Sequence, residues 1–157
     1  MLVRSIRTKP RRRQSRMNEE KKDKIKEKFY TGTGRRKTAV ARVFLWDEKG
    51  DMTVNGRDIN DYFPTEKEQV VWTKPFHIIG VSHPKAKFRA TIKVSGSGKS
   101  SQLGAVAHGI SVALASMNEE YSSMLRKQGL LTRDSRMVER KKPYLHKARK
   151  APQYSKR

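Results

Sequence analysis

Two stretches of the chain alternate apolar and polar positions with a period of two. The first covers residues 39–46. Its alternate positions hold Ala39, Ala41, Val43 and Leu45, and the positions between them include the charged Arg42. In the second, residues 88–95, apolar side chains occupy every other position from Phe88, and polar or charged ones lie between them. Successive side chains of a strand point to opposite faces, so both stretches predict strands with one buried face.

The next pattern is helical. Apolar residues from Ser100 to Met117 fall three and four positions apart, and the positions beside this stripe are small enough for a sheet or a neighbouring chain to approach closely. We expect this helix to be the principal core element. Asn118, followed by two glutamates, is a typical N-cap for a second helix, and Gly129 is a suitable residue to end it.

Shorter elements occupy the middle of the chain. Residues 47–51 predict a hairpin turn into a strand over 52–55, and residues 58–63 predict one helical turn. The spacing of Thr65 and Glu68 is that of a capping box, which predicts a helix that Pro75 stops. The apolar stretch after Pro75 is of uncertain type, and residues 83–87 predict a turn.

The segment Gly32–Lys37 combines two glycines with three consecutive cations. Glycine lets a backbone approach a phosphate chain closely, and the cations neutralise it. The segment is therefore a candidate RNA-binding loop, and the alternative is a flexible turn with solvated charges.

The C-terminal end of the chain has no sustained apolar period. Its last 32 residues, from Arg126, hold 12 Lys or Arg and 2 acids, and Pro143 and Pro152 interrupt any long helix. Such a segment has no face to bury and cannot offset its ordering entropy alone. We expect it to be disordered until it meets a polyanion, with Tyr144 and Tyr154 available to stack on bases.

Charge is distributed unevenly along the 157 residues. Residues 1–28 carry 12 basic and 4 acidic side chains, residues 29–125 carry 13 and 9, and residues 126–157 carry 12 and 2, for a total of +22. A nearly balanced centre between cationic arms predicts three parts. These are a basic N-terminal extension (1–28), a globular α/β RNA-binding domain (29–128) and an extended basic tail (129–157).

Composition also restricts the partners. A pI near 10.6 is typical of nucleic-acid binders. Neither arm has an amphipathic basic helix for a membrane surface, and no apolar run approaches the length of a membrane span. The chain has no cysteine, which excludes disulfides and thiolate chemistry. Residues 1–16 also have the composition of an organelle transit peptide, but Pro10 argues against a clean amphipathic helix, so we expect a retained RNA-binding arm.

Enzyme signatures are weak. The loop Gly96–Ser100 lies between a predicted strand and a predicted helix, but a phosphate-binding P-loop needs a glycine where Lys93 stands. The four histidines lack the spacing of metal ligands, and the nearby pair Asp58 and Asp61 is common on surface turns. We therefore expect no catalytic residues, metal, cofactor or small-molecule substrate. The loop at 96–100 still presents backbone N–H groups that suit an RNA phosphate.

Several motifs together closely resemble one family. They are GTGRRKTAVARV (32–43), VNGRDINDYF (54–63), SSQLGAVAHGISVAL (100–114), LRKQGLLTRDSRMVERKKP (125–143) and KARKAPQYSKR (147–157). Together they resemble ribosomal protein nine of the small subunit, bacterial type, over residues 29–157. The terminal APQYSKR is highly specific to that family.

The resemblance implies an α+β, compact two-layer fold like the second domain of ribosomal protein five, with a left-handed βαβ unit and extended basic arms. It implies a structural constituent of the small ribosomal subunit, located in the cytoplasm or, alternatively, in an organelle ribosome. The implied partners are small-subunit rRNA, peptidyl-site tRNA and neighbouring head proteins. The implied tRNA-binding residues are Ser155, Lys156 and Arg157. The expected rRNA-binding residues are Gly32, Gly34, Arg35, Arg36, Lys37, Arg42, Lys99, Arg133, Arg136, Arg140, Lys141, Lys142, Lys147, Arg149 and Lys150.

Some positions depart from the family pattern. The loop at 95–99 has serines where the family often has glycine, and Ala107 replaces a frequent arginine. An alternative function of a different class is a free architectural nucleic-acid binder, which would bind DNA and RNA comparably.

Overall fold

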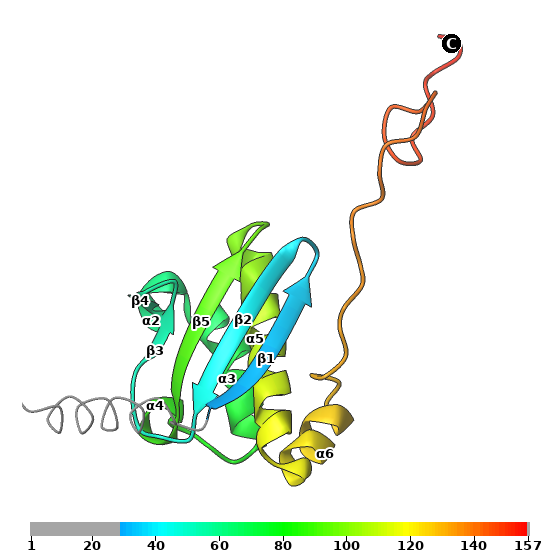
Figure 1. Cartoon of the computed structure of the whole chain (residues 1–157). Helices are drawn as coiled ribbons and strands as arrows, with labels where there is room; N and C mark the ends of the chain where they lie inside the picture. Colours follow the sequence, from blue (N-terminus) through cyan, green and yellow to red (C-terminus); the bar gives the residue numbers. More distant parts are fainter. Residues whose placement is uncertain (1–28, 157) are drawn as a thin grey trace, which may run out of the picture.

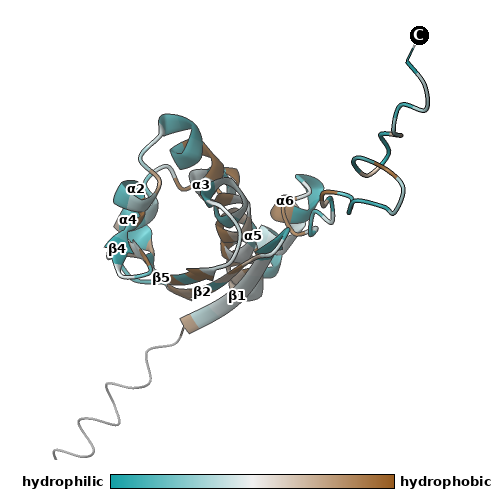
Figure 2. Ribbon diagram, turned by 90° about the horizontal axis from the view of Figure 1, so that it is seen from above, coloured by the Kyte–Doolittle hydropathy of each residue, from teal (hydrophilic) through white to brown (hydrophobic). Residues whose placement is uncertain are grey.

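A computed structural model describes residues 29–156, in which one mixed sheet is covered by helices on a single face (Figures 1 and 2). The predicted N-terminal arm and Arg157 lie outside the described residues. The sheet has five strands in the order β1-β2-β5-β3-β4. The elements are β1 (Phe29–Arg36), β2 (Ala39–Trp46), β3 (Met52–Val54), β4 (Arg57–Asp58), α2 (Ile59–Tyr62), α3 (Glu66–Ile78), α4 (Pro84–Lys87), β5 (Arg89–Ser95), α5 (Lys99–Met117) and α6 (Glu119–Lys127).

The strongest sequence patterns correctly predicted the central elements of the fold. Strand β2 pairs antiparallel with both β1 and β5, and its alternate side chains from Ala39 to Leu45 are buried. On β5 the same face is buried at Ala90, Ile92 and Val94. Helix α5 covers this face, and Asn118 caps α6 by accepting a hydrogen bond from the Glu120 N–H at 3.0 Å. These observations confirm an α+β architecture.

The prediction of a hairpin turn at residues 47–51 is wrong. Strand β3 does not pair with β2, because β5 lies between them and runs parallel to β3. The hairpin in this region instead joins β3 to β4 through Asn55 and Gly56, which have φ angles of 51° and 82°. Asparagine and glycine tolerate these values, which two-residue hairpin turns require.

Helix α3 extends past the proline expected to stop it. The Thr65–Glu68 capping box is present, but the helix continues through Pro75 to Ile78. Pro75 removes one helical hydrogen bond. Pro75 and Phe76 are both buried, and Phe76 packs against Phe88 with ring centroids 5.6 Å apart. Their burial offsets the missing bond. Similarly, the turn expected at 83–87 is the short helix α4, with Pro84 in its first turn.

The predicted loop Gly32–Lys37 is also wrong in its structure, since most of it belongs to strand β1. Gly32 and Gly34 are buried against α5. A Cβ atom on Gly32 would overlap the Gly109 carbonyl oxygen, and one on Gly34 would overlap the Ala105 carbonyl oxygen. The two glycines therefore let helix and strand backbones touch, a packing role that replaces the predicted approach to phosphate.

Asp58 joins two of the small elements. Its carboxylate accepts a hydrogen bond from the Asn60 N–H at 2.8 Å, which caps α2, and from the Lys85 ammonium of α4 at 2.6 Å. The Lys85 hydrogen bond lowers the pKa of Asp58 below its ordinary value, and the Asn60 N–H acts in the same direction.

Two substitutions at Asp58 separate the cap from the ion pair. Asparagine keeps a capping acceptor, so we expect Asp58→Asn to lower the free energy of unfolding by less than about 1 kcal/mol. Alanine removes both interactions, and we expect a loss of about 1–2 kcal/mol. Because the folded-state pKa of Asp58 is lowered, its charge contributes fully to stability above pH 3.8, the ordinary pKa, and this contribution disappears as pH falls through the folded-state pKa. Urea unfolding of wild type and variants at about pH 7 and about pH 2 measures the contribution. A wild-type advantage over Asp58→Asn that persists in acid would contradict the assignment.

Candidate nucleic-acid interface

Cationic side chains gather at one end of the sheet. The β1–β2 turn carries Lys37, which has a φ of 51°, next to the exposed Arg35 and the half-buried Arg36. Gly96, in the loop before α5, packs against the Thr38 carbonyl, so this loop and the turn lie at the same end. Lys99 begins α5 there (Figure 1), and the N-terminal end of a helix favours anions. We call Arg35, Arg36, Lys37 and Lys99 the cationic corner.

The start of the tail is attached to the domain by His108 of α5. The His108 Nδ1 accepts a hydrogen bond from the Arg35 N–H at 3.3 Å, and its Nε2 lies 3.2 Å from the Leu131 carbonyl oxygen. A ring whose Nδ1 accepts carries its proton on Nε2, so His108 donates to Leu131. Leu130 and Leu131 also pack against the core. The tail therefore leaves the domain from a defined place.

Asp134 makes a second attachment. Its carboxylate forms an ion pair with Arg36 of β1 and accepts hydrogen bonds from the backbone and the guanidinium of Arg136, the shortest of them 2.7 Å. This carboxylate holds Arg36 and Arg136 at the junction of domain and tail. Neither Asp134 nor His108 was among the expected functional residues, because Asp134 meets Arg36, and His108 meets Leu131, only once the chain is folded.

The tail contains no helix or strand among residues 129–156, as its lack of periodicity predicts, and extends away from the domain (Figure 1). Glu139 accepts hydrogen bonds from Lys142 at 2.7 Å and Arg149 at 2.9 Å, and these contacts lower the pKa of its carboxyl group. The rings of Tyr144 and Tyr154 are almost fully exposed. The tail thus presents cations and two free aromatic rings.

The expected rRNA-binding residues fall into three places. Arg35, Arg36, Lys37 and Lys99 form the cationic corner, and the tail cations lie on residues 133–150. Arg42 lies on β2, in the open face of the sheet. Gly32 and Gly34 are buried, so we remove them from the candidate interface. Of the expected tRNA-binding residues, Ser155 and Lys156 are exposed near the tip of the tail.

Two other kinds of site are absent from the described part of the chain. No group of three or more His, Asp or Glu side chains there has an arrangement that could hold a metal ion. None of the helices between residues 29 and 156 is both long and apolar enough to cross a membrane.

Comparison with known proteins identifies the family. Residues 34–157 match the model of the family described as ribosomal protein S9/S16. The chain is also 50% identical, over 128 residues, to the small ribosomal subunit protein uS9 of Thermus thermophilus, an alignment that covers 82% of this chain and 98% of the relative. The chain belongs to the S9 family of ribosomal proteins.

Membership confirms several predictions. The chain is a bacterial-type member of the S9 family, a structural protein of the small ribosomal subunit and not an enzyme. It belongs to a ribonucleoprotein that acts in translation, and its location is the cytoplasmic ribosome. The family match begins at residue 34, so the basic N-terminal extension lies outside it.

Proposed function

We propose that this S9-family protein binds small-subunit rRNA in the head with its domain, residues 29–128, and extends its tail, residues 129–157, along that RNA to the peptidyl-site tRNA. The observation that carries the proposal is a cationic, exposed tail fixed at its base by His108 and Asp134. Neighbouring head proteins are the other proposed partners.

The proposed contacts are mainly to phosphate. Arginine and lysine dominate the corner and the tail, and such contacts position a protein on RNA without reading base sequence. Each phosphate contact lowers the logarithm of the binding constant by about 0.7–0.9 for each tenfold rise in salt. A tail bound by charge alone would therefore be released at moderate salt, and docking by the domain is needed to keep it in place.

The tail is expected to take its final shape on RNA. Glu139 pairs with Lys142 and Arg149, and Asp134 pairs with Arg36 and Arg136. Phosphates can replace these carboxylates, because each ion pair is at least partly exposed and such pairs contribute little to stability. The two acids thus hold four cations in the free protein without preventing RNA binding.

The proposed rRNA-binding set is defined by exposure and charge. Its members are Arg35, Arg36, Lys37, Arg42, Lys99, Arg133, Arg136, Arg140, Lys141, Lys142, Lys147, Arg149 and Lys150.

We also infer that the connection between β3 and β5 is left-handed, as in the second domain of ribosomal protein five. Strand β3 runs parallel to β5. Seen from the open face of the sheet, β5 lies to the right of β3 and α3 lies behind them (Figures 1 and 2). A right-handed crossover, which is the usual form, would place β5 on the other side.

The tRNA contact can be tested by removing Ser155, Lys156 and Arg157. We expect subunits carrying this deletion to assemble normally but to hold peptidyl-site tRNA about tenfold less tightly, because two cations at the tip are lost. Filter binding of tRNA to purified small subunits measures the affinity, and sedimentation measures assembly.

A full-length variant with Lys156→Gln and Arg157→Gln provides the matched control for chain length. If the two cations are responsible for the tRNA contact, this variant should lose as much tRNA affinity as the deletion. Equal tRNA affinity in wild-type and both variant subunits would contradict the proposed contact. If the protein is found mostly outside small subunits and binds DNA and RNA with equal affinity, this result would instead support the alternative of a free architectural nucleic-acid binder.

A further inference from the structure

The sheet face opposite α5 is a regular grid of side chains. The pairing of β1, β2 and β5 places Thr33, Arg42 and Lys93 in one row across the three strands. The row nearer the β1–β2 turn holds Arg35, Val40 and Ser95, and the row on the other side has threonines on β1 and β5. This face lies on the side of the sheet without helices (Figure 2).

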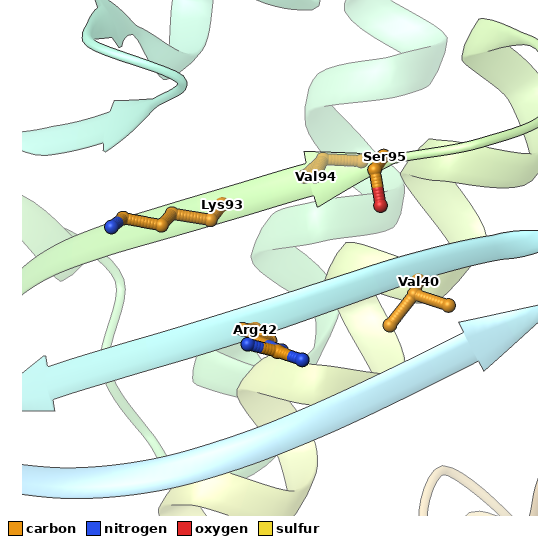
Figure 3. A pocket seen from close by; sticks show the side chains of 5 residues that line it. All are labelled: Val40, Arg42, Lys93, Val94 and Ser95. Carbon is orange, nitrogen blue, oxygen red and sulfur yellow. The ribbon is translucent and has the colours of Figure 1, made fainter.

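Arg42 and Lys93 are like charges on directly paired positions. Both are exposed, and neither side chain has an ion pair or hydrogen bond within the described part of the chain. Like charges opposite each other on neighbouring strands destabilise a sheet. An anion between them would remove this repulsion. Figure 3 shows both side chains on adjacent strands, in front of the helices.

The surface around these cations is hollowed. A shallow groove of about 410 Å³ is lined by Val40, Arg42, Lys93, Val94 and Ser95. Ser95 contributes a hydroxyl group, and Thr33 contributes another from the neighbouring strand. Hydroxyl donors beside arginine and lysine are the groups with which proteins contact phosphate oxygens.

Acidic residues are absent from the outward positions of β1, β2 and β5, which belong to the described residues. They follow instead at the far end of β2, where Asp47 and Glu48 come directly after Trp46. At that end Phe29 and Trp46 pack together with ring centroids 5.9 Å apart, and the Arg89 guanidinium lies 5.1 Å from the Trp46 ring. The outward positions around Arg42 and Lys93 therefore carry positive charge without a nearby acid on these strands, which favours a polyanion.

We infer that an rRNA strand crosses this face, with its phosphodiester backbone in the groove between Arg42 and Lys93. The inference rests on the proposed rRNA binding and adds Lys93, Thr33 and Ser95 to its contacts. RNA is favoured over an acidic protein segment because the cationic corner adjoins the same end of the sheet. One RNA element can thus contact Arg35 and continue across Arg42.

A double substitution, Arg42→Gln with Lys93→Gln, tests the groove in the full-length protein. Removal of two phosphate contacts should weaken binding to a small-subunit rRNA transcript by about 10- to 100-fold at physiological salt and reduce the salt slope by about 1.4–1.8. Lys67→Gln with Lys74→Gln is the matched control, because it removes the same charge from exposed positions on α3. The groove variant should unfold at the same temperature as wild type or higher, since it relieves a repulsion.

Directed cleavage gives an independent readout. The chain has no cysteine, so Thr33→Cys provides a unique attachment point for an iron chelate that cleaves nearby RNA, and Lys74→Cys is its control. We expect strong local cleavage from position 33 and little from position 74. If wild type binds the transcript but the groove variant matches the α3 control and position 33 gives no cleavage, the inference fails while the proposed function stands. If wild type itself does not prefer this transcript to DNA, the proposed function fails. Crosslinks from position 33 to a protein in assembled subunits, without RNA cleavage, would also overturn the inference.

Discussion

Replacement of Gly34 by alanine is expected to lower the free energy of unfolding by about 3 kcal/mol, the upper part of the range for overpacked cores. The added Cβ would overlap the Ala105 carbonyl oxygen and crowd the Gly109 nitrogen. Both are backbone atoms of α5 and cannot rotate away. The helix must therefore shift from the sheet, and the contacts that bury Val106 and Ile110 weaken with it. Urea unfolding of the full-length protein measures the change through the transition midpoint.

Gly104→Ala is the matched control for this substitution. Gly104 lies on the same helix, but a Cβ there would meet only the flexible Arg36 side chain, at 3.3 Å or more. Alanine is a better helix former than glycine by about 1 kcal/mol, so this variant should be as stable as wild type or more stable. Equal effects of the two substitutions would contradict the assignment of a close helix–strand approach at Gly34.

Removal of the tail after Thr132 is expected to have the largest effect on RNA binding. The truncation deletes ten Lys or Arg side chains but keeps Leu130 and Leu131, which pack against the core, and the carbonyl that His108 contacts. Eight of the ten deleted cations belong to the proposed rRNA-binding set. If all eight meet rRNA phosphates, the salt slope for rRNA binding falls by about 6–7, and affinity near physiological salt falls by a factor of about 1,000 or more. Filter binding over a series of salt concentrations measures both quantities.

The fold of the truncated protein must be preserved for this result to be interpreted. Its urea midpoint should lie close to that of wild type, with a loss of about 1 kcal/mol at most from the missing Arg36–Asp134 ion pair, whose two side chains are both partly exposed. A truncated protein that is folded and has an unchanged salt slope would show that the domain alone binds the RNA. The tail would then have no electrostatic role in rRNA binding.

The elements that could be predicted from the sequence are those whose residue pattern reflects one local cause. Residues 88–95 alternate because one face of β5 meets the core and the other is open. The Thr65 capping box is a purely local arrangement of side chain and backbone, and the helix before Asn118 has a long apolar stripe. In each case the signal lies within a few residues of the element that it predicts.

Strand β1 was missed for a physical reason. Its two fully buried positions are Gly32 and Gly34, where α5 comes too close for a side chain, so no alternation of apolar side chains marks the strand. The same glycines were interpreted as phosphate-binding because glycine serves any close backbone approach. The order of the strands could not be predicted from the sequence either, since the insertion of β5 between β2 and β3 depends on contacts between distant segments.

The candidate site likewise has a part that the sequence predicts and parts that depend on the fold. Its tail could be predicted from composition, because ten cations without an apolar period have few alternatives to a polyanion partner. The row of Arg42 and Lys93 exists only once β2 and β5 are paired in register, and the two residues are 51 positions apart in the sequence. The attachment of Leu131 to His108 likewise depends on the packing of α5.

A density map of small ribosomal subunits assembled with this chain tests the central claim most directly. The account predicts a domain docked on rRNA, with continuous density for the tail along RNA phosphates and its last residues beside the peptidyl-site tRNA. A tail that projects into solvent, or tail density that follows proteins and stays remote from both RNAs, would contradict it.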